Sequence, residues 1–165
     1  HTPAGAIEGL KDYSVTLMAA SKTFNVAGLG TSFAIIENPS VRAKFKHAAG
    51  GLVPWPNVLG LVAVEAAFNE CNSWRLAQLA YLRKNRDYLV EQINNIEGLS
   101  AIAPQATFLL WVNASQLNIE NTQSWIEGKG VGPSPGKDFG DSTFFRLNFG
   151  CSFDFLEQIV ARIRA

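Results

Sequence analysis

The sequence predicts an α/β fold, and three observations support this prediction. Apolar and polar residues alternate between Asp12 and Leu17, which is the period-two pattern of a strand. Apolar residues then recur at helical spacings between Leu79 and Ile96. Beyond Leu99 the pattern changes to short strands and further helices. With 165 residues, of which 47% are hydrophobic, the chain can bury the core of one domain or of two small ones.

Two strands and a short helix are expected before residue 50. The first strand alternates apolar residues with polar ones and continues to Ala20; its members are Tyr13, Val15 and Leu17 against Asp12, Ser14 and Thr16. Thr31–Glu37, rich in Phe and Ile, predicts the second strand. Asn38 and Pro39 end it and begin a helix that continues to about Ala48, because proline is tolerated in the first helical turn.

A stretch rich in glycine and proline, residues 50–56, then breaks regular structure. It indicates either a crossing point between two domains or an ordinary loop. Helical segments follow to about Asn95, with one buried face made by Leu79, Leu82, Leu89, Ile93 and Ile96. The charged residues Arg83, Lys84, Arg86 and Asp87 fall mostly on the other face, which we interpret as solvated rather than as a nucleic-acid site. Gly98 is expected to stop the helix.

The last third of the sequence predicts a small sheet with helices on one face. Its strands are expected at Leu99–Ala103, Thr107–Asn113 and Thr143–Phe149, with a helix near Glu120–Gly128 between the last two. A final helix from about Phe153 to Ile163 is expected to turn five residues inward, namely Phe155, Leu156, Ile159, Val160 and Ile163.

Charge and composition narrow the possible partners to a small molecule. Lys plus Arg and Asp plus Glu number 14 each, so no excess charge favours nucleic acid or an anionic membrane. No stretch approaches the roughly 20 apolar residues of a membrane span. Cys71 and Cys151 have no metal-type spacing, which favours free thiols in a reducing compartment, the cytoplasm, and we expect no metal site.

Lys22 is the main candidate for a chemical role. It follows the first strand in the run Ala19-Ala20-Ser21-Lys22-Thr23, where small residues let a planar ring approach the backbone and two hydroxyls can bind a phosphate. A lysine that forms a Schiff base must react as the neutral amine. On these grounds alone, a solvated surface lysine is the commoner interpretation.

The longer sequence run around Lys22 changes that interpretation. Ser-Lys-Thr-Phe-Asn-x-Ala-Gly-Leu from Ser21 to Leu29 resembles the cofactor-lysine motif of fold type I pyridoxal-phosphate enzymes, and most of all that of the cystathionine β-lyase-like carbon-sulfur lyases. Further segments are similar to the family in the same order, namely Gly28–Glu37, Ala66–Phe68, Trp74, Tyr81–Leu89, Ala106–Val112, Pro133–Gly140 and Phe145–Phe149.

The resemblance implies the C-terminal part of a fold type I aminotransferase, made of the end of the large-domain sheet and an α+β small domain. Residues 1–56 would be the remnant of the large cofactor-binding domain and residues 57–165 the interdomain helix and small domain. It also implies a homodimer in which Lys22 forms the Schiff base with pyridoxal phosphate and Ser21 contacts the cofactor. In the family enzymes, the first half of the chain carries most contacts to the cofactor, and the resemblance places His1 after that half. We therefore expect a fragment that binds the cofactor weakly or not at all and is inactive.

Arg146 is the second candidate, since it lies in a strand of aromatic and aliphatic residues where an isolated guanidinium is costly. An internal salt bridge to Asp or Glu would explain it. Its planar fork also matches a carboxylate, and the resemblance implies that the arginine of Phe-Arg-Leu-Asn binds the α-carboxylate of an amino-acid substrate.

Other residues carry weaker signals. Ser134, Pro135 and Gly136 form a turn that could approach the substrate, and Trp111 and Phe108 could line a pocket, although turns and cores commonly use such residues. His47 is interpreted as a surface residue.

Three functions remain open for the whole protein. The resemblance favours a carbon-sulfur β-lyase acting on cystathionine- or cysteine-type amino acids. The first arginine after Lys22 is Arg42, a departure from many aminotransferases, which supports the lyase. An amino-acid aminotransferase and the aminotransferase-like, ligand-sensing domain of a regulator are the alternatives.

Overall fold

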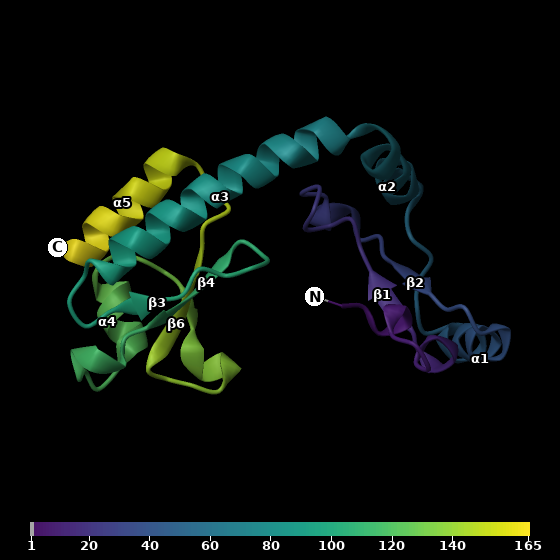
Figure 1. The fold of residues 1–165 in the computed structure, drawn as a ribbon, viewed down its shortest axis with the longest axis horizontal. Coiled ribbons are helices and arrows are strands. Elements are labelled where there is room, and N and C mark those ends of the chain that lie inside the picture. Colours follow the sequence, from purple (N-terminus) through teal and green to yellow (C-terminus); the bar gives the residue numbers. More distant parts are fainter. Residues whose placement is uncertain (1) are drawn as a thin grey trace. The chain divides into compact units, whose positions relative to one another are not determined.

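The computed structural model describes residues 2–165, which form two compact units (Figure 1). The first ends at Leu76 and the second is Ala77–Ala165. His1, on which the expectation of a fragment partly rests, lies outside the described residues. The division at residues 56 and 57 refers to the domains of the family enzyme and stays a prediction. The compact units divide later in the chain, because Ala67 packs with Ala20 and Phe24 in the first unit.

The first unit contains a small antiparallel sheet. β1 (Thr16–Met18) pairs with β2 (Phe33–Ile35), and Leu17 lies opposite Ala34. Both strands are shorter than predicted. The prediction was wrong for Asp12 and Tyr13, which belong to a 3-10 turn, Lys11–Tyr13, closed by the hydrogen bond from Tyr13 N to Leu10 O (3.0 Å). In such a turn the backbone N–H and C=O groups bond to nearby residues. The alternation of polar and apolar residues there therefore does not reflect pairing with another strand.

Two helices of the first unit begin at asparagine caps. α1 (Pro39–Ala49) has Asn38 as its cap, whose side chain accepts hydrogen bonds from Ser40 N and Val41 N, and proline occupies its first turn as predicted. α2 (Val58–Glu70) has Asn57 as its cap. Between them, residues 50–57 contain neither helix nor strand, which confirms the predicted break.

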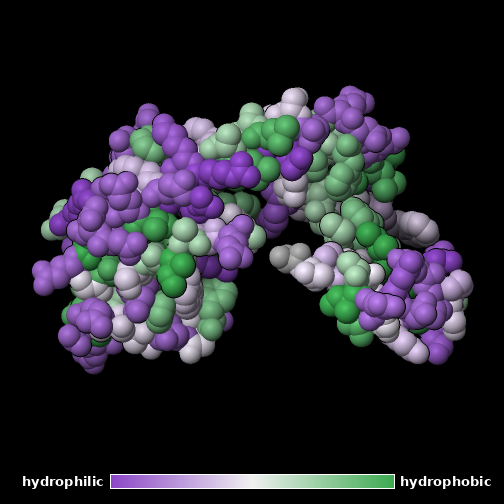
Figure 2. All heavy atoms as spheres, in the orientation of Figure 1, coloured by the Kyte–Doolittle hydropathy of each residue, from purple (hydrophilic) through white to green (hydrophobic). Residues whose placement is uncertain are grey.

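Apolar side chains remain on the surface of the first unit. Figure 2 shows hydrophobic residues among its outer atoms, and the exposed ones include Leu17, Val58, Leu59 and Val62. Surfaces of this kind are commonly covered by other protein.

The second unit contains a four-stranded antiparallel sheet in the order β3-β4-β6-β5. Its strands are β3 (Ser100–Ala101), β4 (Leu109–Asn113), β5 (Ser134–Pro135) and β6 (Phe144–Asn148). Its helices are α3 (Asn72–Asn94), which begins in the first unit, α4 (Thr122–Gly128) and α5 (Phe153–Arg164). The predicted strands and helices are found within a few residues of their expected positions, and β5 was not predicted.

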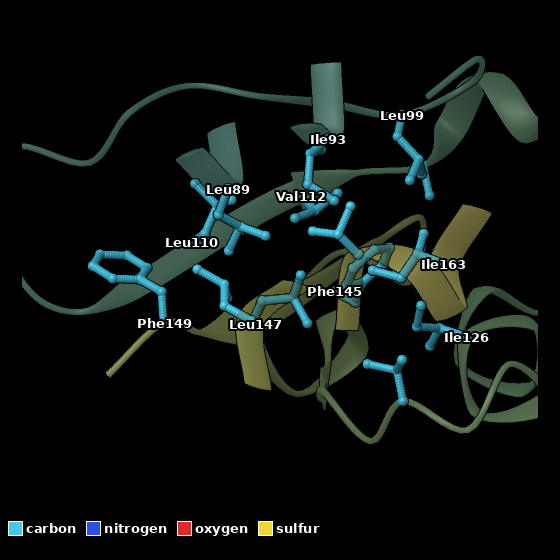
Figure 3. Close-up of a cluster of buried hydrophobic side chains, with 14 residues drawn as sticks. Leu89, Ile93, Leu99, Leu110, Val112, Ile126, Phe145, Leu147, Phe149 and Ile163 are labelled. Carbon is cyan, nitrogen blue, oxygen red and sulfur yellow. The ribbon is translucent and has the colours of Figure 1, made fainter. Parts of the chain in front are cut away.

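One face of this sheet carries the core. Leu110 and Val112 of β4 and Phe145 and Leu147 of β6 point to the same side, where they pack against helices α3, α4 and α5 (Figure 3). Leu89, Ile93, Leu156, Val160 and Ile163 are buried in this core, as predicted. The other predicted inward positions are less buried: Leu82, Ile96 and Ile159 pack against the core, and Leu79 is half-buried outside it. Figure 1 shows α3 and α5 side by side over this face. Residues with odd numbers in β4 and even numbers in β6 therefore point to the opposite face.

The inward position predicted for Phe155 was wrong, since this side chain is 54% exposed. The buried positions of α5 are Leu156, Val160 and Ile163, which follow one another at helical spacing. Phe155 lies about 100° around the helix from Leu156 and so falls outside the buried stripe.

Asn85 of α3 ties this helix to the segment after β6. It is completely buried, and its Nδ2 donates to Phe149 O and Cys151 O, both at 2.9 Å. Within residues 2–165, no helix is long and apolar enough to cross a membrane.

Candidate functional site

Lys22 lies in a tight turn directly after β1. Residues 21–25 form the turn, which is closed by hydrogen bonds from Phe24 N to Ala20 O (2.9 Å) and from Val26 N to Ser21 O (3.0 Å). Asn25 has a φ of 55°, a left-handed conformation that asparagine tolerates better than most residues. The side chain of Lys22 is exposed.

Two buried residues flank the lysine and fix the turn. Ala20 is 1% exposed, and Phe24 is buried against Ala67 of α2. The ring of Phe24 meets Phe68 edge to face, with 5.5 Å between centroids, and stacks on Trp74 at 6.4 Å. The backbone on both sides of Lys22 is therefore anchored while its amine stays accessible.

A second attachment holds the chain that follows the turn. Asn57 Nδ2 donates to Leu29 O at 2.8 Å, and Asn57 Oδ1 accepts from Gly60 N at 2.8 Å. A Cβ added to Gly60 would lie 2.7 Å from Leu29 O and closer still to Thr31 Oγ1. Only glycine lets the start of α2 approach the segment so closely. This attachment was not predicted, although Asn-x-x-Gly at a helix start is a usable signal in the sequence.

The residue types around Lys22 fit the aldehyde of pyridoxal phosphate, which reacts with an amine, and its phosphate, which is held by hydrogen bonds. An exposed primary amine can condense with an aldehyde, and its sequence neighbours Ser21 and Thr23 carry hydroxyls that can donate to a phosphate. Within the described part of the chain, no carboxylate forms an ion pair with Lys22. Arg42 is engaged elsewhere, since its Nη1 donates to Ile36 O at 2.9 Å and Glu37 O at 3.4 Å.

Arg146 lies at the centre of β6, on the face of the sheet that the helices leave open. The antiparallel register puts it opposite Trp111 of β4 and Ser134 of β5. Its neighbours Phe145 and Leu147 point to the core on the other face (Figure 3). The alternation of the strand thus separates the guanidinium from the core.

The guanidinium has only neutral partners. Its Nη2 donates to Ser134 Oγ at 3.2 Å, and its Cζ lies 4.3 Å from the centroid of the Phe139 ring. Between residues 2 and 165, no carboxylate lies within ion-pair distance of it, so the internal salt bridge considered as an alternative is not formed. Its Nε is buried and has no hydrogen-bond acceptor in the same stretch.

Of the weaker candidates, two gather around Arg146. Ser134 binds it directly, and Trp111 on the neighbouring strand stacks on Phe144 with 5.1 Å between ring centroids. Phe108 instead packs against the core, and His47 is exposed in the last turn of α1. The contact of Phe139 with Arg146 was not predicted, because Phe139 entered only as part of the motif Pro133–Gly140.

A cavity borders the same arginine. Its volume is about 260 Å³, and its lining includes Ser134, Arg146, Phe155 and Arg162. Arg162 is partly engaged, because its Nη1 donates to Gly130 O at 2.7 Å. The cavity therefore lies where β6 and residues 130–134 meet α5, and Arg146 and Arg162 give its lining positive charge.

Comparison with known proteins identifies the class of this protein. The chain belongs to the class I and II aminotransferase family, whose family model matches residues 2–163. Within the family it is 32% identical to cystathionine beta-lyase PatB of Bacillus subtilis and 32% identical to the cystathionine beta-lyase of Corynebacterium glutamicum. The alignments cover 100% and 97% of this chain but only 45% and 44% of those two proteins.

Solved structures share the fold. The crystal structure of OvoB matches with a TM-score of 0.94 and 44% identity, over 99% of this chain and 43% of OvoB. Cystalysin from Treponema denticola, whose crystal structure contains pyridoxal 5′-phosphate, matches with a TM-score of 0.88 and 27% identity, over 96% of this chain and 42% of cystalysin.

These matches confirm the predicted family and fold class, the C-terminal part of a fold type I aminotransferase, with a resemblance to the cystathionine β-lyase-like group. The chain spans less than half the length of each relative. The roles of Lys22, Ser21 and Arg146 stay predictions.

Proposed function

We propose that this chain is the C-terminal part of a pyridoxal-phosphate-dependent carbon-sulfur β-lyase that acts on cystathionine- or cysteine-type amino acids. By the whole enzyme we mean a protein of the relatives' length that contains this chain. The observation that carries the proposal is the exposed Lys22 amine on a turn anchored by Ala20 and Phe24, in a sequence similar to cystathionine β-lyases.

Lys22 and Ser21 would hold the cofactor, Lys22 through its amine and Ser21 through its hydroxyl. Bound pyridoxal phosphate supplies an electron sink for the pair of electrons released at the substrate α-carbon. Lys22 is exposed in this chain, so the rest of the whole enzyme would shield it from water.

Arg146 would bind the substrate carboxylate. Its charge is not neutralised by any carboxylate of the described residues, and a planar guanidinium donates two parallel hydrogen bonds to the two oxygens of a carboxylate. This contact would orient the substrate α-carbon. Lys22 Nζ would then take the α-proton as a general base. Loss of a thiol from the β-carbon, followed by hydrolysis, gives pyruvate and ammonia.

Substitution of Lys22 tests the proposal. In the whole enzyme, Lys22→Ala should abolish the release of pyruvate and thiol from L-cystathionine. Lys44→Ala, which removes another exposed lysine, should leave it unchanged. Full activity of the Lys22→Ala enzyme would contradict the assignment.

An amino-acid aminotransferase is the alternative, because relatives with that name match as well. The LL-diaminopimelate aminotransferase of Nitratidesulfovibrio vulgaris is 27% identical over 95% of this chain. The products separate the two reactions. A lyase releases a thiol, whereas an aminotransferase passes the amino group to a keto acid and leaves the carbon-sulfur bond intact.

Assembly and location complete the proposal. We propose a homodimer for the whole enzyme, supported by the apolar surface of the first unit, and a cytoplasmic location, supported by the free thiols of Cys71 and Cys151. The isolated 165 residues would bind the cofactor weakly or not at all and show little activity.

A further inference from the structure

The guanidinium of Arg146 is held by two neutral groups of its own unit. Phe139 presents its ring 4.3 Å from Arg146 Cζ, and Ser134 Oγ accepts a hydrogen bond from Arg146 Nη2. Because Ser134 lies directly opposite Arg146 in the antiparallel register, the sheet itself brings the hydroxyl to the guanidinium. Neither contact removes the positive charge, as a carboxylate would.

Phe139 is itself fixed by its backbone and by a second ring. It ends the short turn Gly136–Phe139, whose first residue is buried. A Cβ on Gly136 would lie 2.7 Å from Phe144 C, so this turn sits directly on β6. The ring of Trp111 meets Phe139 edge to face at 5.8 Å and stacks on Phe144 at 5.1 Å. The ring on which the guanidinium rests is therefore packed against the sheet.

We propose that Phe139 and Ser134 are positioning residues, which hold Arg146 in the orientation that binds the substrate carboxylate. The proposal rests on the proposed function, in which Arg146 binds that carboxylate. An arginine side chain is long and flexible, and it loses rotamer freedom when it is fixed for a two-oxygen contact. Phe139 and Ser134 impose this order beforehand, so less affinity is lost when the substrate binds.

The order of the guanidinium can be measured without any substrate. The NMR order parameter of the Arg146 Nε–Hε bond should be high in the 165-residue chain and fall below about 0.6 in the Phe139→Leu variant. Phe139→Tyr should restore it, because the aromatic face is kept. The matched control Phe45→Leu, which changes an exposed ring on α1, should leave it unchanged. An equally ordered Nε–Hε bond in Phe139→Leu would overturn the role of Phe139.

Kinetics of the whole enzyme with L-cystathionine test the consequence. Phe139→Leu and Ser134→Ala should each raise KM about tenfold with little change in kcat. Phe139→Tyr and Ser134→Thr should restore KM. In an Arg146→Ala background, Phe139→Leu should have no further effect on KM, because the group that it positions is gone.

The outcomes separate this inference from the proposed function. If Arg146→Ala leaves KM unchanged, or L-cystathionine is not converted, the proposed function is wrong and the NMR experiment alone decides the positioning. If Arg146→Ala raises KM while Phe139→Leu and Ser134→Ala do not, the positioning is wrong and the proposed function stands.

Discussion

The close approach of α2 to the segment after Lys22 predicts that Gly60→Ala destabilises the first unit. The added Cβ would lie 2.7 Å from Leu29 O and still closer to Thr31 Oγ1. Contacts this short cannot be kept, so the start of α2 or the Leu29–Thr31 segment must move. The hydrogen bond from Asn57 Nδ2 to Leu29 O spans the same gap and would lengthen with it.

The magnitude follows from two opposing effects. Overpacking of a well-packed site costs about 1–3 kcal/mol. Replacing glycine by alanine in a helix recovers about 0.5–1 kcal/mol of that cost. The difference spans about 0–2.5 kcal/mol, and because the added Cβ would meet backbone at 2.7 Å we expect a net destabilisation in the upper part of that range, about 1–2 kcal/mol.

Urea denaturation of the 165-residue chain, followed by circular dichroism, measures this change. With a slope of about 2 kcal/mol per molar urea, the midpoint should fall by about 0.5–1 M. Gly28→Ala is the matched control, because a Cβ on Gly28 meets nothing within 4 Å, and it should change stability by no more than about 0.5 kcal/mol. A Gly60→Ala chain as stable as the control would refute the argument from close approach.

Three further predictions concern the second unit. Leu156→Ala removes a buried side chain and should destabilise the chain by about 2–5 kcal/mol in the same assay. Phe155→Ala changes an exposed position and should alter stability by less than about 0.5 kcal/mol. Equal effects of the two substitutions would contradict the described core. Hydrogen bonds from the hydroxyl and the backbone N–H of Thr143 lower the pKa of the Asp141 carboxyl. Their contribution to folding stability is therefore complete at a pH above the ordinary carboxyl pKa, and it is lost as the pH falls through the lowered pKa. Carbon NMR titration should show this pKa rising in Thr143→Val, and an unchanged pKa would exclude the hydroxyl as its cause. Burial raises the pKa of the Cys151 thiol, so at pH 8 iodoacetamide should modify it more slowly than a cysteine in a short peptide, and equal rates would contradict its burial.

The sequence predicted the helices better than the strands, for physical reasons. α1 begins at an asparagine cap followed by proline, and α5 carries a regular apolar stripe, so local residues determine both. A strand exists only where another strand pairs with it, and pairing depends on distant residues. For this reason β1 and β2 were predicted too long, and the two-residue strand β5 was missed.

The candidate site divides in the same way. Lys22 and Arg146 could be chosen as candidates because their residue types and flanking motifs are local features of the sequence. The contacts that hold them are not local. Asn57 reaches Leu29 across 28 positions, and Ser134 reaches Arg146 across 12. No periodicity in the sequence reports such a contact, and only the folded chain shows which groups surround each candidate.

The attachment of the cofactor to Lys22 tests the central claim most directly. The whole enzyme and the 165-residue chain would each be mixed with pyridoxal phosphate, reduced with borohydride and mapped by peptide mass spectrometry. We predict a label at Lys22 in the whole enzyme and none in the isolated chain. An active whole enzyme without a label at Lys22 would contradict the account.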